Sequence, residues 1–229
     1  MSGLSRPSPP PGSPRDSFRR GVRAGVPLSL VSFLLALSFG VLAVQSGFTV
    51  AQAVAMSALV HAGSAQFAAT SIVTAGGGLL PGVLAGTLMN ARFLAMGIAL
   101  APSLTRGPAV RALQGQTVVD PSWVLANRGD GTFDRHLLMG ATVPQYAGWL
   151  SGTLAGAVAG DLVGDTARFG LDAVFPTFFL ALLAAELRDP RSRGVAVAGA
   201  VVALALVPVA PPGVPVLVAA VVALVGLAR

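Results

Sequence analysis

The sequence consists mainly of apolar segments, several of which are long enough to cross a lipid bilayer. An α-helix rises about 1.5 Å per residue, so about 20 residues cross a hydrocarbon core about 30 Å thick. Of the 229 residues, 54% are hydrophobic and only 10% are charged, which is more apolar surface than a soluble domain of this length can bury. The apolar segments are residues 26–44, 49–74, 79–100, 137–159, 171–187, 195–209 and 214–227.

These segments predict a membrane protein built from helices. They are almost continuously apolar, whereas the strands of a membrane β-barrel alternate between apolar and polar residues. We therefore expect an all-α fold, a polytopic membrane helix bundle of about six or seven hydrophobic segments. Residues 1–17 are rich in Pro and Ser and predict a disordered cytoplasmic tail, and residues 18–229 predict a single transmembrane domain.

The second apolar segment, 49–74, has polar and small residues at its centre, where positions 61–66 read HAGSAQ. Two half-helices that meet here would leave unpaired backbone N–H and C=O groups at depth. Such groups are tolerated only where they are buried in protein or line a polar cavity. The alternative is one long, tilted helix in which Gly63 and Ser64 allow close helix packing.

The distribution of arginine favours a segment 49–74 that enters the membrane and returns to the same side. Cytoplasmic loops of membrane proteins are enriched in Lys and Arg. If every segment crossed once from a cytoplasmic N-terminus, six arginines would lie inside and eight outside. If segment 49–74 dips in and returns, thirteen lie inside and only Arg168 lies outside. In this second topology the helices that contain Pro27 and Pro144 both begin on the cytoplasmic side, so the faint internal repeat around these prolines would be parallel rather than inverted.

Arg92 is a charged residue within the apolar segment 79–100, which contains no Asp or Glu. A charge at the centre of a membrane helix costs on the order of 2.5–3.5 kcal/mol, so such residues usually face a polar cavity or a counter-ion. The planar guanidinium group of arginine matches a carboxylate. The alternative is that the Arg92 side chain extends to a nearby membrane surface or packs on backbone carbonyls.

Five residues are candidates for binding an amino acid. Backbone N–H groups at the start of a half-helix attract a carboxylate, and Arg92 offers a second carboxylate partner. An amide side chain can accept a hydrogen bond from an ammonium group. The predicted substrate-binding residues are therefore Gly63, Ser64, Gln66, Asn90 and Arg92.

Polar residues and a proline in or near the apolar segments are candidates for coupling and gating. Carboxylates that are partly removed from water can take up protons, and a proline inside a membrane helix frees a backbone carbonyl. The alternative for the acids is that they are solvated loop ends or helix caps. The candidates are His61, Asp120, Asp172 and Pro176.

The sequence lacks the motifs of several other classes of protein. It has no cysteine, which excludes disulfides and thiolate metal sites. It contains neither His-Glu-x-x-His nor Gly-x-Ser-x-Gly, so we predict no enzyme activity, no cofactor and no metal site. The net charge of +6 comes from arginines in the tail and in short loops, which we interpret as topology signals rather than a nucleic-acid surface.

Four short motifs stand out along the chain: Phe18-Arg19-Arg20-Gly21 with Pro27, the run AGSAQF at 62–67, Asn90-Ala91-Arg92, and Gly170-Leu171-Asp172 followed by Phe175-Pro176. Together they resemble the AzlC family, the large subunits of two-component exporters of branched-chain amino acids. The resemblance covers about residues 18–227 and depends chiefly on the order and spacing of the second and third motifs.

The resemblance implies a permease of the bacterial inner membrane that works with a small AzlD-like membrane subunit. It implies export of valine, leucine and isoleucine, with methionine as a further candidate, by secondary transport. Where many members have Thr-Asp-Glu, this chain has Val119-Asp120-Pro121, so Asp120 is the acid that remains. The alternatives are a non-transporting assembly or regulatory subunit, or an exporter of another small amino or organic acid.

Overall fold

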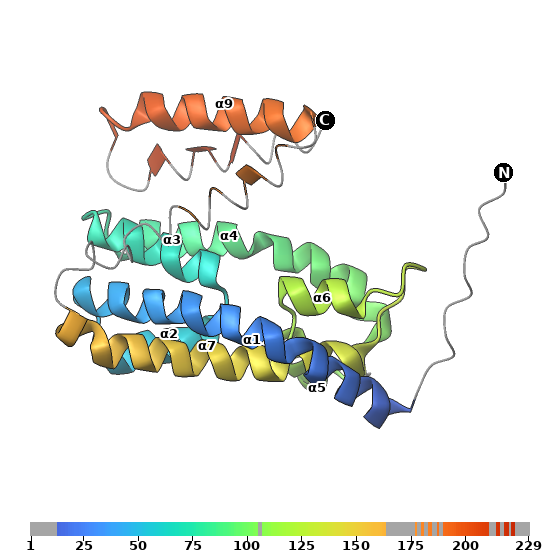
Figure 1. The fold of residues 1–229 in the computed structure, drawn as a ribbon. Coiled ribbons are helices and arrows are strands. Elements are labelled where there is room, and N and C mark those ends of the chain that lie inside the picture. The colour runs from blue at the N-terminus through green and yellow to red at the C-terminus, as the bar shows by residue number, and fades with distance from the viewer. Residues whose placement is uncertain are drawn as a thin grey trace. The chain divides into compact units, whose positions relative to one another are not determined.

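The computed structural model describes residues 13–104, 107–163 and 190–210, together with positions 177, 180, 183, 184, 187, 214, 215, 218, 219, 221 and 222. These residues contain helices and no β-strand, which confirms the all-α fold class. The helices are α1 (Pro14–Gln45), α2 (Val50–Val60), α3 (Gly63–Thr74), α4 (Leu79–Leu100), α5 (Pro108–Gly115), α6 (Asp120–Ala126), α7 (Arg135–Val163) and α9 (Pro190–Leu206), with a 3-10 helix at Ala101–Ser103 (Figure 1).

Four of the apolar segments correspond to observed helices. Segments 26–44, 79–100 and 137–159 lie in α1, α4 and α7, and segment 195–209 overlaps α9. Among the described residues, Pro14–Gln45 and Leu79–Ser103 are long and apolar enough to cross a membrane. Segments 171–187 and 214–227 lie largely outside the described residues.

Helix α1 begins earlier than expected. Residues 14–17, which the sequence placed in the disordered tail, form its first turn. The hydroxyl of Ser13 accepts a hydrogen bond from the backbone N–H of Asp16 and donates one to the Asp16 carboxylate. Pro14 occupies the first position of the helix, where its missing N–H has no consequence. A local capping motif thus extends the helix into the polar region, while residues 1–12 lie outside the described part.

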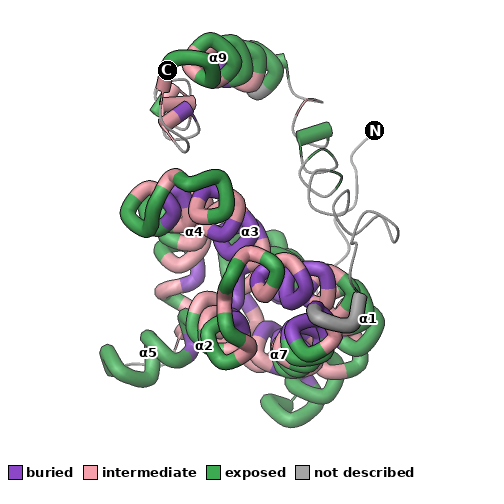
Figure 2. Tube along the Cα trace, turned by 90° about the vertical axis from the view of Figure 1, so that its left-hand side faces the viewer, coloured by how far each residue is buried: buried purple, intermediate pink, exposed green. Residues whose placement is uncertain are grey.

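The chain divides into two compact units, residues 1–32 with 92–148 and residues 33–91 with 149–229. We call them the first and the second unit. The core of the first unit gathers around Leu100 and Leu138, and that of the second around Phe39, Phe67 and Trp149. In the second unit the rings of Phe39 and Phe67 meet edge to face, with their centroids 5.6 Å apart. The start of α3 is among the buried segments (Figure 2).

Helices α1 and α7 run parallel and pack backbone against backbone within each unit (Figure 1). Glycines on α7 face carbonyl oxygens of α1 so closely that a Cβ atom would collide with them. The paired residue numbers rise together along both helices, which shows that the helices are parallel. The pairs are Gly140 with Phe18 and Gly148 with Ser29 in the first unit, and Gly152 with Phe33 and Gly156 with Leu37 in the second.

Segment 49–74 is broken into the two short helices α2 and α3. They have 11 and 12 residues, so each is about 16–18 Å long and too short to cross a bilayer core by itself. Helix α4 then packs antiparallel to α3, with Gly82 near Ala69 and Gly86 near Ala65. If every segment crossed a membrane once, α1 and α7 would be antiparallel, which differs from their parallel packing within each unit. Their parallel arrangement is the one that a returning segment 49–74 requires.

The polar connection 102–136 contains the two short helices α5 and α6. Both begin with a proline at one of their first two positions, Pro108 in α5 and Pro121 in α6. The chain then turns back through a single β-bridge between Asn127 and Phe133 before α7 begins. Helix α6 lies in the first unit, and Asp120 is its first residue.

Candidate functional site

The break between α2 and α3 is formed by His61 and Ala62. Helix α2 ends because His61 adopts the left-handed backbone conformation (φ 43°, ψ 41°), which is uncommon for a residue other than glycine. Ala62 is the N-cap residue of α3 and makes no side-chain capping hydrogen bond. The first N–H groups of α3 are therefore not capped by the residue that precedes the helix, which leaves them suited to binding an anion.

A buried chain of hydrogen bonds ties α2 and α3 to α7. The indole N–H of Trp149 donates to the Gln66 side-chain oxygen (2.9 Å), and the Gln66 amide nitrogen donates to the Ser57 hydroxyl (2.9 Å). The hydroxyls of Ser57 and Thr153 lie 2.7 Å apart. Gln66, Ser57 and Thr153 are fully buried. Both polar ends of the Gln66 side chain are thus engaged by the protein, so Gln66 holds the two half-helices in place.

Trp149 also covers the first residue of α3. A Cβ atom at Gly63 would lie only 2.6 Å from Cη2 of the Trp149 ring, so only glycine fits beneath it. The next residue, Ser64, is buried. Gly63, Ser64 and Gln66, three of the predicted binding residues, therefore lie together at the start of α3, and Trp149 packs over this turn.

Asn90 lies one turn beyond Gly86 on α4. Gly86 packs near Ala65, and α4 runs antiparallel to α3, so the register brings Asn90 level with the break. The side-chain oxygen of Asn90 is buried and has no hydrogen-bond partner among the described residues, and the same holds for the hydroxyl of Thr70 on α3. A buried acceptor without a partner is unfavourable and calls for a ligand or a water.

Arg92 has a counter-ion that its own helix does not supply. In the first unit its Nη2 atom lies 2.9 Å from Oδ2 of Asp120, the first residue of α6. Both side chains are partly exposed, 38% for Arg92 and 51% for Asp120. Two residues that the sequence assigned to different roles, substrate binding and coupling, are thus partners in one ion pair.

A second buried polar cluster anchors α6 to α7 in the first unit. The Ser122 hydroxyl contacts the Thr142 hydroxyl (2.8 Å) and the Gln145 amide nitrogen (2.9 Å). Thr142 also donates to the backbone oxygen of Thr117 (2.6 Å). Ser122, Thr142 and Gln145 are all buried. Because Ser122 is only two residues after Asp120 on α6, the hydrogen bonds of Ser122 also hold Asp120 in position.

The polar residues of α7 were not among the predicted site residues. Thr142, Gln145, Trp149 and Thr153 follow one another at spacings of three and four residues, so they share one face of the helix. The sequence carried this signal, because polar side chains at helical spacing in an apolar segment mark a face that is turned away from lipid. Their contacts with α2, α3 and α6 depend on the tertiary fold.

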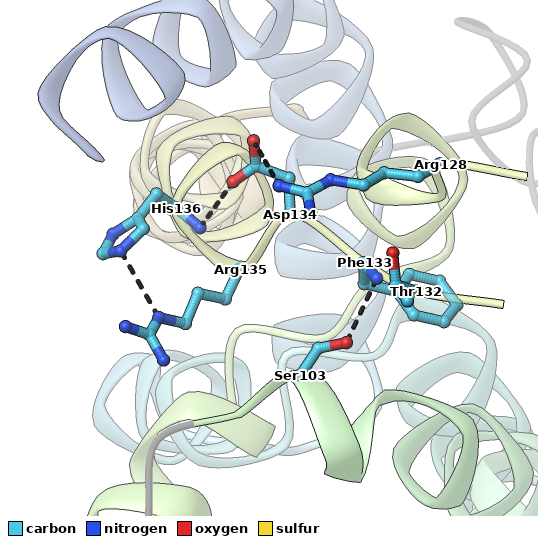
Figure 3. A pocket seen from close by; sticks show the side chains of 7 residues that line it. All are labelled: Ser103, Arg128, Thr132, Phe133, Asp134, Arg135 and His136. Atoms are coloured by element: carbon cyan, nitrogen blue, oxygen red, sulfur yellow. Dashed lines mark hydrogen bonds and ion pairs between the residues drawn. The ribbon is translucent and has the colours of Figure 1, made fainter. Parts of the chain in front are cut away.

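A pocket of about 330 Å³ lies at the start of α7, in the first unit (Figure 3). Asp134 caps α7 by accepting hydrogen bonds from the backbone N–H groups of His136 and Leu137, both at 3.1 Å. Arg128 pairs with the same carboxylate at 3.5 Å. Partial burial acts to raise the pKa of Asp134, but the Leu137 N–H, the Ser17 hydroxyl and Arg128 outweigh it and hold the pKa below its usual value of 3.8.

Two of the predicted coupling and gating residues, Asp172 and Pro176, lie outside the described residues. The other two are placed by the structure. His61 forms the left-handed end of α2, and Asp120 pairs with Arg92. The proposed coupling roles of all four stay predictions.

Comparison with known proteins identifies relatives of this chain. The family model described as AzlC protein matches residues 27–163. The inner membrane protein YgaZ of Escherichia coli (strain K12) is 26% identical over 202 residues, which cover 82% of this chain and 81% of that protein. An uncharacterized membrane protein of Archaeoglobus fulgidus is 30% identical over 191 residues, covering 82% of this chain and 84% of that protein. No solved structure matches this chain.

The matched residues include the α2–α3 break, Asn90, the Arg92–Asp120 pair and all of α7. The family that this comparison identifies is the one that the sequence motifs resemble, and both relatives are named as membrane proteins. The chain therefore belongs to the AzlC family of membrane proteins.

Proposed function

We propose that this chain is a secondary transporter that exports branched-chain amino acids and binds them at the α2–α3 break. Membership of the AzlC family supports a role in membrane transport, and the preference for valine, leucine and isoleucine, with methionine as a further candidate, is our inference. The observation that carries the proposal is a broken helix whose ends are surrounded by buried polar side chains. Transporters commonly bind their substrates at such discontinuous helices.

In this proposal the start of α3 binds the substrate carboxylate. The N–H groups after Ala62 point out of the helix end, and the helix dipole favours a negative charge there. Gly63 and Ser64 supply these groups without a bulky side chain. The oxygen of Asn90, which is buried without a described partner, is the acceptor for the ammonium group. Gln66 acts indirectly, because its amide is bonded to Trp149 and Ser57.

The topology that we propose has the N-terminus in the cytoplasm and α2–α3 as a re-entrant pair in a multi-pass protein of the bacterial inner membrane. It is supported by the parallel α1 and α7 and by the arginine distribution. We further propose that a small AzlD-like membrane subunit completes the transporter. Exposed apolar side chains on α4 and α9, such as Leu94, Ile98 and Leu204, suit contact with lipid or with such a subunit.

The test is valine export from proteoliposomes that contain this chain and its small subunit. We expect Asn90→Ala to weaken transport mainly by raising the apparent KM, because an acceptor for the ammonium group is lost. Thr87→Ala, a change one turn away on the same helix at an exposed position, is the matched control and should export as the wild type does. Equal transport by Asn90→Ala and the wild type would contradict the assignment of this site.

A binding measurement separates the transporter from a purely regulatory subunit. A ligand that binds the folded protein raises its unfolding temperature in proportion to the logarithm of its concentration. We expect valine to stabilise the purified chain in detergent. If valine has no effect on either the chain or its complex, the assembly or regulatory role becomes the better explanation.

A further inference from the structure

The Arg92–Asp120 pair lies in a setting from which its two charges can separate. Nη2 of Arg92 lies 2.9 Å from Oδ2 of Asp120, and both side chains are partly exposed. Ion pairs in this situation contribute little stability, because water can solvate each charge when the pair opens. The pair can therefore open at little cost when a better partner for either charge is present.

Contacts other than the ion pair hold α6 near Asp120 and support the guanidinium group of Arg92. Ser122 bonds to Thr142 and Gln145 on α7 and so anchors α6 close to Asp120. The guanidinium carbon of Arg92 lies 5.1 Å from the centre of the Phe93 ring, a cation–π contact that supports it from one side. The contacts of Ser122 and Phe93 do not involve the ionic contact itself, so they are not lost when the two charges separate.

The same region contains a donor that the described protein does not use. The indole nitrogen of Trp123 is buried and has no hydrogen-bond partner among the described residues. Trp123 is three residues after Asp120, on the same side of α6, and it packs with Phe93 on one apolar cluster. A buried N–H without an acceptor is unfavourable, so a ligand with a carboxylate oxygen would satisfy it.

We infer that the Arg92–Asp120 pair of the first unit is a binding site for an amino-acid zwitterion, in addition to the site proposed at the α2–α3 break. The ligand carboxylate takes the place of Asp120 on Arg92, and the ligand ammonium group pairs with the released Asp120. Every charge keeps a partner during this exchange. The identity of the ligand as an amino acid rests on the proposed function, whereas the pairing of its two charges rests on the geometry of Arg92 and Asp120.

The site would select zwitterions over singly charged analogues. A ligand that has only a carboxylate leaves Asp120 without a cation, and a ligand that has only an amine leaves Arg92 without an anion. The unpaired charge loses its ionic partner and is left to water, so the affinity falls by the modest amount that a partly exposed ion pair contributes, which is a means of discriminating between ligands. This selection would operate on substrates that enter or leave the transporter, whatever their apolar side chain.

The experiment measures binding of valine, valinamide and isovalerate to the purified wild type and to two variants. Valinamide has the ammonium group without the carboxylate, and isovalerate has the carboxylate without the ammonium group. We expect Asp120→Asn to reduce the preference for valine over isovalerate, and Arg92→Gln to reduce the preference for valine over valinamide, each by about two- to fivefold. Arg128→Gln breaks the other described ion pair of this unit and should leave both preferences unchanged.

Several results would overturn the inference. If Asp120→Asn and Arg92→Gln weaken all three ligands equally, or change none of them, the pair is only structural. Unfolding temperatures without ligand show whether the variants are folded, and Asp120→Glu, which keeps the charge, should retain the wild-type preferences. Failure of the proposed function is a different result, namely that the wild type binds valine but does not export it. Absence of any valine binding by the wild type would contradict both proposals.

Discussion

At the scale of the residue, Gly63 is required by the close approach of a neighbouring ring. Its position at the start of α3 leaves space for a hydrogen atom but not for a methyl group, because Cη2 of Trp149 would lie 2.6 Å from the added carbon. Gly86 on α4 differs, since an added carbon there would be 3.4 Å from the Ala65 carbonyl oxygen, at the edge of ordinary contact. A side chain is therefore excluded at position 63, whereas at position 86 it would be only tightly packed.

We predict that Gly63→Ala destabilises the protein by about 1–3 kcal/mol, because the methyl group displaces Trp149 or the turn beneath it. Gly86→Ala is the matched control. It should change the unfolding free energy by less than about 1 kcal/mol, because alanine is also favoured over glycine inside a helix. Thermal unfolding in detergent measures both variants. Equal stability of Gly63→Ala and Gly86→Ala would show that the ring does not press on the turn.

The chain has two tryptophans, and the same substitution at each tests the hydrogen bond to Gln66. Trp149→Phe keeps an aromatic ring but removes the donor to a fully buried amide, so we expect a loss of about 0.5–2 kcal/mol. Trp123→Phe removes an N–H group that has no partner among the described residues and should cost less in the absence of ligand. Chemical or thermal unfolding compares them, and a greater loss for Trp123→Phe would refute this account.

At the scale of the element, α1, α3 and α7 differ in whether a side chain caps the first turn of the helix. Ser13 caps α1 and Asp134 caps α7, whereas α3 follows an alanine that makes no cap. A capped terminus has its first N–H groups satisfied by a side chain and is structural, whereas α3 begins without a side-chain cap from the residue that precedes it. The contrast between α7 and α3 therefore separates a helix start that stabilises the fold from one that we assign to binding.

For α7 we predict a pH-dependent contribution from Asp134. Its folded pKa lies below 3.8, so the charged carboxylate stabilises the protein fully above that pH, and the contribution disappears as the pH falls through the lower, folded value. Asp134→Ala should cost about 0.5–2 kcal/mol at pH 7, and Asp134→Asn, which can still cap, should cost less. Unfolding temperatures measured from pH 7 to pH 3 give the result. A difference between Asp134→Asn and the wild type that persists undiminished at pH 3 would contradict the assignment.

At the scale of the whole molecule, the parallel packing of α1 and α7 carries most of the information on topology. Two helices with carbonyl-to-glycine contacts along their length must begin on the same side of any membrane that they cross. An even number of crossings then separates the start of α1 from the start of α7, counting α1 and not α7. If α1 crosses, this requires that one of segment 49–74 and α4 crosses and the other does not. The break at His61 makes segment 49–74 the candidate, since α2 and α3 are each too short.

We test this topology with single cysteines, because the chain contains none. Cysteines at the exposed positions Arg15 and Ala112 should react with a membrane-impermeant reagent from the same side, and a cysteine at Ala75 from the opposite side. A topology in which each segment crosses once would instead place positions 15 and 75 together, with 112 opposite. Whole cells and inverted vesicles distinguish the two sides, and activity of each variant confirms that it is inserted correctly.

The apolar segments were sufficient to predict the fold class, and the arginine distribution was sufficient to propose a direction for each helix. The residues HAGSAQ marked the helix break, because polar and small residues in an apolar segment compete with a continuous helix. The start of α1 at Pro14 differs from the sequence prediction, because the Ser13 cap extends the helix into the polar region. The sequence identified Asn90 as a candidate binding residue, but its alignment with the break depends on the antiparallel register of α3 and α4.

By itself the sequence determined a helical membrane protein with an unusual arginine, resembled the AzlC family and favoured a broken second segment over one long helix, since these properties follow from local composition and spacing. Only the tertiary structure decided the partners of the polar groups. It placed Trp149 over Gly63, joined Gln66 to Ser57 and paired Arg92 with Asp120. Contacts of this kind link residues from 9 to 86 positions apart, and a linear pattern does not encode which of many polar side chains will meet.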